Sequence, residues 1–253
     1  THHGADEQQG ERGDRRGEGE VREPQVGPSV RGRPAADHAD RRHGHEDHVG
    51  ALAYILKKFN LPVYGSRFTL ALAEKRLEEF RMLDDVMMHR VEAGQTAEIG
   101  KFRVQFIHAS HSLVDCFSLA IHTPVGTLVH TGDYKIDDTP VIGKPYDLES
   151  LGKVGDNGVL ALLCDSTNST VPGRTPSERA VIPAFEEIFE QATGRLIVAT
   201  FSSSIHRLQI VFTIAHQFGK KVCILGRSMV KNVEVAEEQG LLKIPYGTMV
   251  DLS

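Results

Sequence analysis

Apolar residues beyond residue 43 recur at the spacing of regular secondary structure, and the first stretch predicts a helix, a strand and a second helix. Apolar positions in residues 51–59 and again in residues 70–80 follow the helical period. The short run from Leu61 to Gly65 lies between them and is a strand candidate.

A strand-like pattern follows in the middle of the chain. Phe102, Val104 and Phe106 alternate with polar residues. The segments 117–123 and 127–131 flank Pro124-Val125-Gly126, a turn sequence, so a hairpin is expected there. This stretch therefore predicts an antiparallel sheet.

From residue 159 onward the pattern alternates between strands and helices. Gly194, Gly219 and Gly240 stand where the three expected helices should stop. Such alternation is typical of a parallel sheet covered by helices, so the predicted fold class is α/β with the beginning of a Rossmann-like arrangement. The expected strands cover residues 159–164, 196–200 and 222–225, and the expected helices cover residues 177–192, 205–218 and 229–239.

Residues 1–42 differ in composition from the rest of the chain. They contain no Leu, Ile, Met, Phe, Tyr or Lys, but many Arg, Gly, Asp and Glu residues. Such a segment cannot bury enough apolar surface to offset the entropy cost of ordering it, so disorder is one interpretation. Translation of a GC-rich gene out of frame is the other, because it also yields Arg, Gly, Pro and Ala without Lys.

Charge and apolar content exclude several classes of protein. The net charge of -5 gives no global attraction to nucleic acid. No apolar run approaches the roughly 18 to 20 residues of a membrane span, and no signal-peptide core is present, so we expect a cytoplasmic protein without a membrane partner. Cys116, Cys164 and Cys223 lie in apolar contexts and are expected to be buried, reduced thiols.

One cluster carries candidate chemistry. His43, His45, Asp47 and His48 put three imidazoles and a carboxylate within six positions, just before the first helix. Nitrogen and carboxylate ligands are those that zinc prefers at catalytic sites. A histidine-rich surface loop or a tag-like tract is the alternative.

Two further residues support a metal site. His111 follows the alternating strand, and Asp133 follows the apolar segment 127–131. A histidine at one strand end, an aspartate at another and the histidine cluster at a third are what a dinuclear metal site at one sheet edge requires. The order and the types of these candidate ligands resemble those of proteins with the metallo-β-lactamase fold.

Further blocks along the chain make the resemblance specific to one family of this fold. The blocks HGHEDHVGAL, LPVYGSRFTLAL, HSLVD, HTGDYKID, CDSTNSTVPGRTPSE, ATFSSSIHRLQ and ILGRSMVKN together resemble ribonuclease J, in the β-CASP branch of that fold. They cover residues 43–253 almost continuously. The resemblance implies an incomplete αββα metallo-β-lactamase sandwich over residues 43–176, lacking its N-terminal half-sheet, and the start of a β-CASP domain over residues 177–253.

The resemblance also implies roles for individual residues. His43, His45 and His111 would hold one zinc ion, Asp47 and His48 would belong to a second, and Asp133 would bridge the two. Asp47 is also the family's candidate for handling the proton of the attacking water. Asp165 would support the site without ligating. The implied catalytic residues are thus Asp47, Asp133 and Asp165, and the metal ligands are His43, His45, Asp47, His48, His111 and Asp133.

A turn before the second helix of the β-CASP region is the candidate for RNA phosphates. Its hydroxyls, its guanidinium and the helix N-terminus suit that role. The alternative is that its serines only cap the helix while His206 and Arg207 solvate the first turn of that helix. The residues concerned are Ser202, Ser203, Ser204, His206 and Arg207.

The family resemblance implies a zinc-dependent ribonuclease with endonuclease and 5′-to-3′ exonuclease activity in RNA maturation and decay. Its RNA would carry a 5′-monophosphate, and the protein would form homo-oligomers. The family's further zinc ligand and phosphate-binding motif would lie beyond Ser253, so this chain is expected to be impaired. A non-catalytic RNA-binding fragment, a DNA nuclease and a hydrolase of small thioesters remain alternatives.

Overall fold

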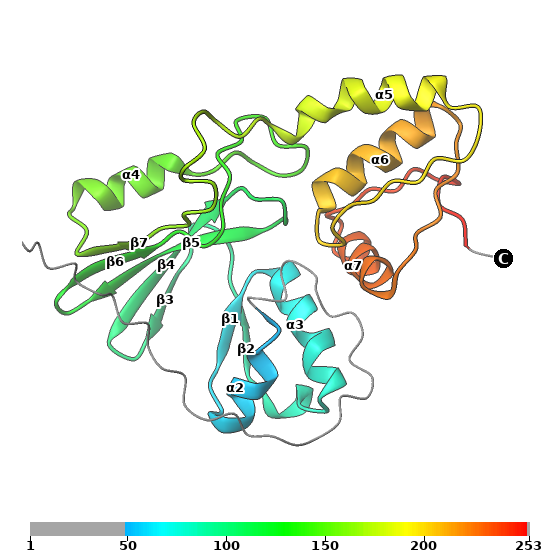
Figure 1. The fold of residues 1–253 in the computed structure, drawn as a ribbon. Coiled ribbons are helices and arrows are strands. Elements are labelled where there is room, and N and C mark those ends of the chain that lie inside the picture. The colour runs from blue at the N-terminus through cyan, green and yellow to red at the C-terminus, as the bar shows by residue number, and fades with distance from the viewer. Residues whose placement is uncertain (1–48, 252–253) are drawn as a thin grey trace, which may run out of the picture. The chain divides into compact units, whose positions relative to one another are not determined.

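The computed structural model of the chain describes residues 49–251, which form two β-sheets and flanking helices (Figure 1). The mixed architecture confirms the α/β fold class. The interpretations of residues 1–42 and the cluster from His43 to His48 lie outside the described residues.

The first described elements confirm the predicted order of helix, strand and helix. Helix α2 (Leu52–Lys58) leads to strand β1 (Val63–Gly65) and helix α3 (Arg67–Glu79). The α3 N-terminus is fixed by Ser66, whose side chain accepts a hydrogen bond from the backbone N–H of Thr69. A short 3-10 turn, η1 (Leu83–Asp85), leads to strand β2 (Met88–Arg90), which pairs parallel with β1.

The second sheet has five strands in the order β3-β4-β5-β6-β7. The first four strands pair antiparallel, and β5 and β6 form the predicted hairpin around Pro124 and Val125. Strand β7 pairs parallel with β6. The strands are β3 (Thr96–Ile99), β4 (Phe102–Ala109), β5 (Cys116–Thr123), β6 (Gly126–His130) and β7 (Ala161–Leu163).

Helix α4 (Leu148–Asp156) forms the crossover between β6 and β7 and covers one face of this sheet (Figure 1). Its Val154 packs against Ile107 of β4 and Val129 of β6. On the opposite face Val104 and Phe106 form a separate cluster, because successive side chains of a strand point to opposite faces.

The remaining helices were all predicted. They are α5 (Ile182–Gln191), preceded by the 3-10 turn η2 (Glu178–Val181), α6 (Ile205–Gln217) and α7 (Arg227–Glu238). Ile205 and Phe212 of α6 pack with Val233 of α7 in a core that also contains Phe68 of α3. This core therefore joins α6 and α7 to α3.

The prediction of strands at residues 196–200 and 222–225 was wrong for the described part of the chain. Residues 196–200 are not extended into any sheet, and Ile197 is 89% exposed. In residues 222–225 only an isolated parallel bridge joins Val222 to Met249. An apolar run becomes a parallel strand only when neighbouring strands satisfy its backbone groups, and within residues 49–251 neither run has a full partner strand.

The cysteine prediction was correct in part. All three residues are free thiols, but Cys164 and Cys223 are exposed and Cys116 is half-buried. Cys164 directly follows β7, the edge strand whose Leu162 is 61% exposed, and Cys223 lies in the segment that forms only the isolated bridge. In the part of the chain that is described, no helix is long and apolar enough to cross a membrane.

Candidate metal and phosphate site

Strand direction brings three of the predicted site residues to one edge of the five-stranded sheet. Strands β4, β6 and β7 run in the same direction, because β4 and β6 are both antiparallel to β5 and β7 is parallel to β6. His111 follows β4, Asp133 follows β6 and Asp165 follows β7. The carboxyl ends of all three strands, and hence the three residues, therefore lie at the same sheet edge.

His111 and Asp133 face each other at this edge. The Nε2 atom of His111 lies 3.8 Å from Oδ2 of Asp133, and both side chains are partly exposed. The Ser112 hydroxyl lies 3.2 Å from the same imidazole nitrogen. One histidine nitrogen and one carboxylate oxygen at this separation suit two ligands of a shared ion, since zinc bonds to both atom types are about 2.0 to 2.2 Å long.

The turn that carries Asp133 is held in place by its backbone. Gly132 has a φ of +61°, and a Cβ there would lie 3.0 Å from the carbonyl oxygen of Phe117, so the turn requires glycine. Two residues after Asp133, the backbone N–H of Lys135 donates to the carbonyl oxygen of Ser110 at 2.7 Å. The segments before His111 and after Asp133 are thus bonded directly.

Asp165 supports this turn. Its carboxylate accepts hydrogen bonds from the backbone N–H groups of Thr167, at 2.8 Å, and of Tyr134. These contacts and the nearby His111 hold the pKa of Asp165 below its usual value, the bond from Thr167 contributing most. The carboxylate therefore stays ionised beside the residue that follows Asp133.

The described residues include two candidate metal ligands that face each other, His111 and Asp133. Within residues 49–251 no group of three or more His, Cys, Asp and Glu side chains is arranged to hold an ion. The donor chemistry of His111 and Asp133 fits zinc, and the further ligands that the family resemblance implies are His43, His45, Asp47 and His48. Those candidate ligands lie outside the described residues, so their assignment stays a prediction.

The predicted RNA-binding turn, residues 202–207, lies at the N-terminus of α6 and is named the α6 turn. Ser202, Ser203 and Ser204 are all buried, and no side chain caps the helix. Ser203 is 4% exposed, and its hydroxyl has no hydrogen-bond partner among the described residues. A buried hydroxyl without a partner costs about 1 to 3 kcal/mol, so this group would gain from a ligand.

The alternative that His206 and Arg207 only solvate the first turn of α6 was wrong. His206 is 4% exposed, and its Nδ1 accepts a hydrogen bond from the backbone N–H of Ile142 at 3.2 Å. Burial lowers the pKa of His206 to about 4, so the imidazole is neutral near pH 7. Arg207 donates from Nε and Nη2 to Glu178. The proposal that the serines merely cap α6 was also wrong, since none of their side chains does so.

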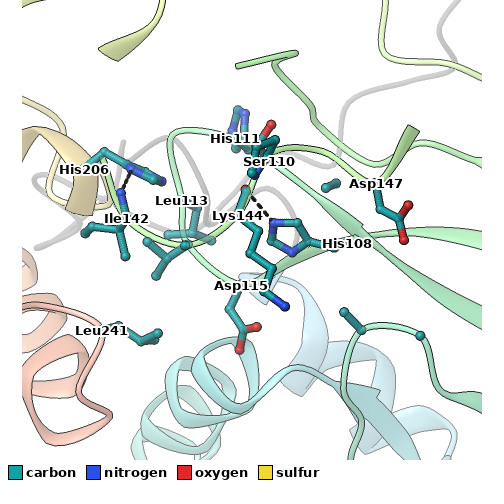
Figure 2. A pocket seen from close by; sticks show the side chains of 16 residues that line it. His108, Ser110, His111, Leu113, Asp115, Ile142, Lys144, Asp147, His206 and Leu241 are labelled. Carbon is teal, nitrogen blue, oxygen red and sulfur yellow. Dashed lines mark hydrogen bonds between the residues drawn. The ribbon is translucent and has the colours of Figure 1, made fainter. Parts of the chain in front are cut away.

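A cavity of about 590 Å³ lies beside the sheet edge and is lined by both His111 and His206 (Figure 2). His108 also lines it, and its Nε2 lies 3.0 Å from the carbonyl oxygen of Lys144. His108 thus has a backbone partner across the cavity, a contact that sequence spacing did not predict. The cavity places the candidate metal ligand His111 next to the α6 turn.

Glu178 is a residue of this region that the sequence analysis missed. Its carboxylate accepts from Lys135 at 3.0 Å and from Arg207 at 2.7 Å. Burial alone would raise the pKa of Glu178, but the hydrogen bonds from these two cations lower it further than burial raises it. The TPSE block contained the residue, but nothing in its local pattern indicated partners so distant in sequence.

Comparison with solved structures supports the fold. A protein of unknown function from Enterococcus faecalis has a TM-score of 0.52 over 76% of this chain and 49% of its own, with 13% identity. At that identity the likeness concerns the fold alone.

Sequence comparison defines the class of protein. Residues 23–148 match the β-lactamase superfamily domain, and residues 193–253 match the β-CASP domain of ribonuclease J. The chain therefore joins a β-lactamase superfamily domain to part of a β-CASP domain. The first match begins within residues 1–42, and the domain boundaries expected from the sequence stay predictions.

The relatives narrow this class to one family. Ribonuclease J of Synechocystis sp. is 46% identical over 212 residues, which are 83% of this chain and 33% of the relative. Ribonuclease J of Helicobacter pylori is 41% identical over 83% of this chain, and that of Corynebacterium glutamicum is 42% identical over 87%. The chain belongs to the ribonuclease J family. It spans about a third of the length of these relatives.

Proposed function

We propose that the chain is part of a zinc-dependent ribonuclease that hydrolyses RNA phosphodiesters. The observation that carries the proposal is the meeting of His111, Asp133 and Asp165 at one sheet edge in a member of the ribonuclease J family. Endonuclease and 5′-to-3′ exonuclease activities, acting in RNA maturation and decay in the cytoplasm, belong to the same proposal. So does assembly into homo-oligomers.

In this proposal some site residues bind metal, and Asp165 keeps the site in shape. His111 and Asp133 would ligate together with His43, His45, Asp47 and His48, with Asp133 shared between two ions. Zinc, when bound, lowers the pKa of water to about 7 and so supplies hydroxide at neutral pH. In the proposal, the carboxylate of Asp165 keeps the turn around Asp133 in place through the N–H of Tyr134.

A 5′-monophosphate is the RNA end that the α6 turn suits. The N-terminus of α6 has no side-chain cap from its N-cap residue and leaves backbone N–H groups to an anion, and Ser203 adds a buried hydroxyl without a partner among residues 49–251. Ser202, Ser204, His206 and Arg207 complete the candidate phosphate contacts. Arg207 already pairs with Glu178, so we expect it to contribute less to phosphate binding than the other residues.

The test is cleavage of matched RNA and DNA strands of one sequence by this chain with added zinc, using His111→Ala as the inactive control. We expect slow cleavage of RNA alone, because the chain spans a third of its relatives. Cleavage of both strands would favour a DNA nuclease. RNA binding without cleavage, surviving His111→Ala while zinc is lost, would favour a non-catalytic binding fragment. Hydrolysis of thioesters without RNA cleavage would reject the ribonuclease.

A further inference from the structure

Glu178 connects two segments that are far apart in sequence. Its Oε1 atom accepts from Nζ of Lys135, and its Oε2 atom accepts from Nε and Nη2 of Arg207 at 3.1 and 2.7 Å. Lys135 is 43 residues away and Arg207 is 29 residues away. Each carboxylate oxygen is therefore committed to a different segment.

The two segments carry the two halves of the proposed site. Lys135 follows the turn of Asp133, and its backbone N–H is bonded to Ser110, next to His111. Arg207 lies in the first turn of α6, three residues after Ser204, the last of the candidate phosphate-binding serines. The side chain of Glu178 thus reaches both the metal-ligand edge and the α6 turn.

Glu178 is itself fixed independently of its two cations. Its backbone N–H donates to Oδ2 of Asp137 at 3.1 Å, and the hydroxyl of Ser177 donates to the same oxygen at 3.0 Å. Asp137 is buried and also accepts from the N–H of Thr139. The carboxylate therefore starts from an anchored backbone, and only 13% of its side chain is exposed.

Charged hydrogen bonds shielded from water are the strongest polar contacts that a carboxylate makes. A carboxylate whose two oxygens hold cations on separate segments fixes the distance between those segments. Lys135 and Arg207 carry like charges, so these two side chains are held near each other only with an anion between them.

We propose that Glu178 is a positioning residue that sets the spacing between the Asp133 turn and the α6 turn, and thereby the preference for 5′-monophosphorylated RNA. This inference rests on the proposed function, since it assumes that the α6 turn meets a 5′-phosphate. When the 5′-phosphate of the RNA is bound at the α6 turn, the distance to His111 and Asp133 decides whether the rest of the RNA fits the metal-ligand edge. In the proposal, Glu178 sets that distance.

The test compares the whole chain with Glu178→Gln, which keeps the shape of the side chain but removes its charge. Affinities for 5′-monophosphorylated and 5′-hydroxyl RNA of one sequence are measured by fluorescence anisotropy. We expect Glu178→Gln to reduce the preference for the monophosphate about tenfold and to leave binding of the 5′-hydroxyl RNA and the zinc content unchanged. Glu149→Gln is the matched control, because Glu149 pairs with Lys153 at the exposed surface.

A second variant and a second measurement separate positioning from folding. Glu178→Asp keeps the charge but is too short to span both cations, so an intermediate loss of preference is expected. Hydrogen exchange should increase in residues 133–137 and 202–209 together in Glu178→Gln, and remain unchanged elsewhere. An increase in hydrogen exchange throughout the chain would show that Glu178→Gln is unfolded. The positioning role would then be tested with Glu178→Asp.

The outcomes distinguish the two proposals. A wild-type chain that does not prefer the monophosphate contradicts the phosphate role of the α6 turn and, with it, the role of Glu178. A wild-type preference that persists in both Glu178 variants, or falls equally in Glu149→Gln, overturns the positioning role alone.

Discussion

Nε2 of His111 lies 3.8 Å from Oδ2 of Asp133, although the two residues belong to segments separated by the whole β5–β6 hairpin. They meet because β4 and β6 flank β5 and run in the same direction. This pair predicts that metal binding depends on both residues. His111→Ala and Asp133→Asn should each lose bound zinc, measured by elemental analysis after dialysis.

The control for this prediction is His122→Gln. His122 lies on β5, where its Nδ1 contacts the Thr127 hydroxyl at 3.1 Å, away from the sheet edge. Its zinc content should equal that of the wild type. Full zinc retention in His111→Ala would contradict the assignment of the ligand.

The buried imidazole of His206 predicts a pH-dependent stability. Its pKa falls from 6.5 to about 4 on folding, so the unfolded chain takes up the proton first as the pH drops. Stability should therefore be complete above about pH 6.5 and decline as the pH falls towards 4. Between pH 7.5 and 5 the loss should be about 2 kcal/mol, measured by urea unfolding.

His206→Gln tests the origin of that loss, because glutamine has no titrating group but still offers an acceptor to the N–H of Ile142. Its stability should change less than that of the wild type over the same range. Measurements end at pH 5, since the pKa values of Asp137 and Glu178 are lowered and these carboxylates contribute stability that is lost only below their unfolded values. Parallel pH profiles for wild type and variant would reject the prediction.

Ser203 predicts opposite effects on stability and binding. The Ser203 hydroxyl is buried and has no hydrogen-bond partner in the described part of the chain, so Ser203→Ala should leave stability unchanged or raise it by about 1 kcal/mol. The same change should weaken binding of 5′-monophosphorylated RNA. Thermal unfolding and fluorescence anisotropy measure the two effects.

Ser118→Ala is the comparison, because Ser118 is buried and its hydroxyl donates to the carbonyl of Thr131 at 2.6 Å. That variant should lose about 1 to 3 kcal/mol of stability, since it leaves a buried partner unsatisfied, and should still bind RNA. A Ser203→Ala variant destabilised as much as Ser118→Ala would indicate a bonded hydroxyl.

The three cysteines should differ in reactivity. Cys164 and Cys223 are exposed and should react with a maleimide in the native chain. Cys116 should react only after unfolding, because burial, with Asp115 and Asp133 nearby, raises the pKa of its thiol to about 12. Mass spectrometry of native and urea-treated samples counts the labels. Rapid labelling of Cys116 in the native chain would contradict this assignment.

Local sequence signals predicted the elements that depend on local forces. The helical period of residues 205–218 and the turn at Pro124 to Gly126 were sufficient for α6 and for the β5–β6 hairpin. Helix α4 was missed, because two of its nine residues are glycines and its apolar face is short. The strands expected at 196–200 and 222–225 did not form, since a run of apolar residues does not indicate which segment will pair with it.

The amino-acid sequence by itself determined the family of the chain, its helices except α4, its antiparallel hairpin and the identity of the candidate ligands His111 and Asp133. Only the tertiary structure decided that Asp165 holds the turn after β6, that Ser203 is buried without a partner among the residues described, and that Glu178 joins Lys135 to Arg207. The reason is the sequence distance over which the deciding interactions act. Helical periods and turns are set by neighbours a few residues apart, whereas burial and ion pairing depend on which distant segments the sheet and the helices bring together.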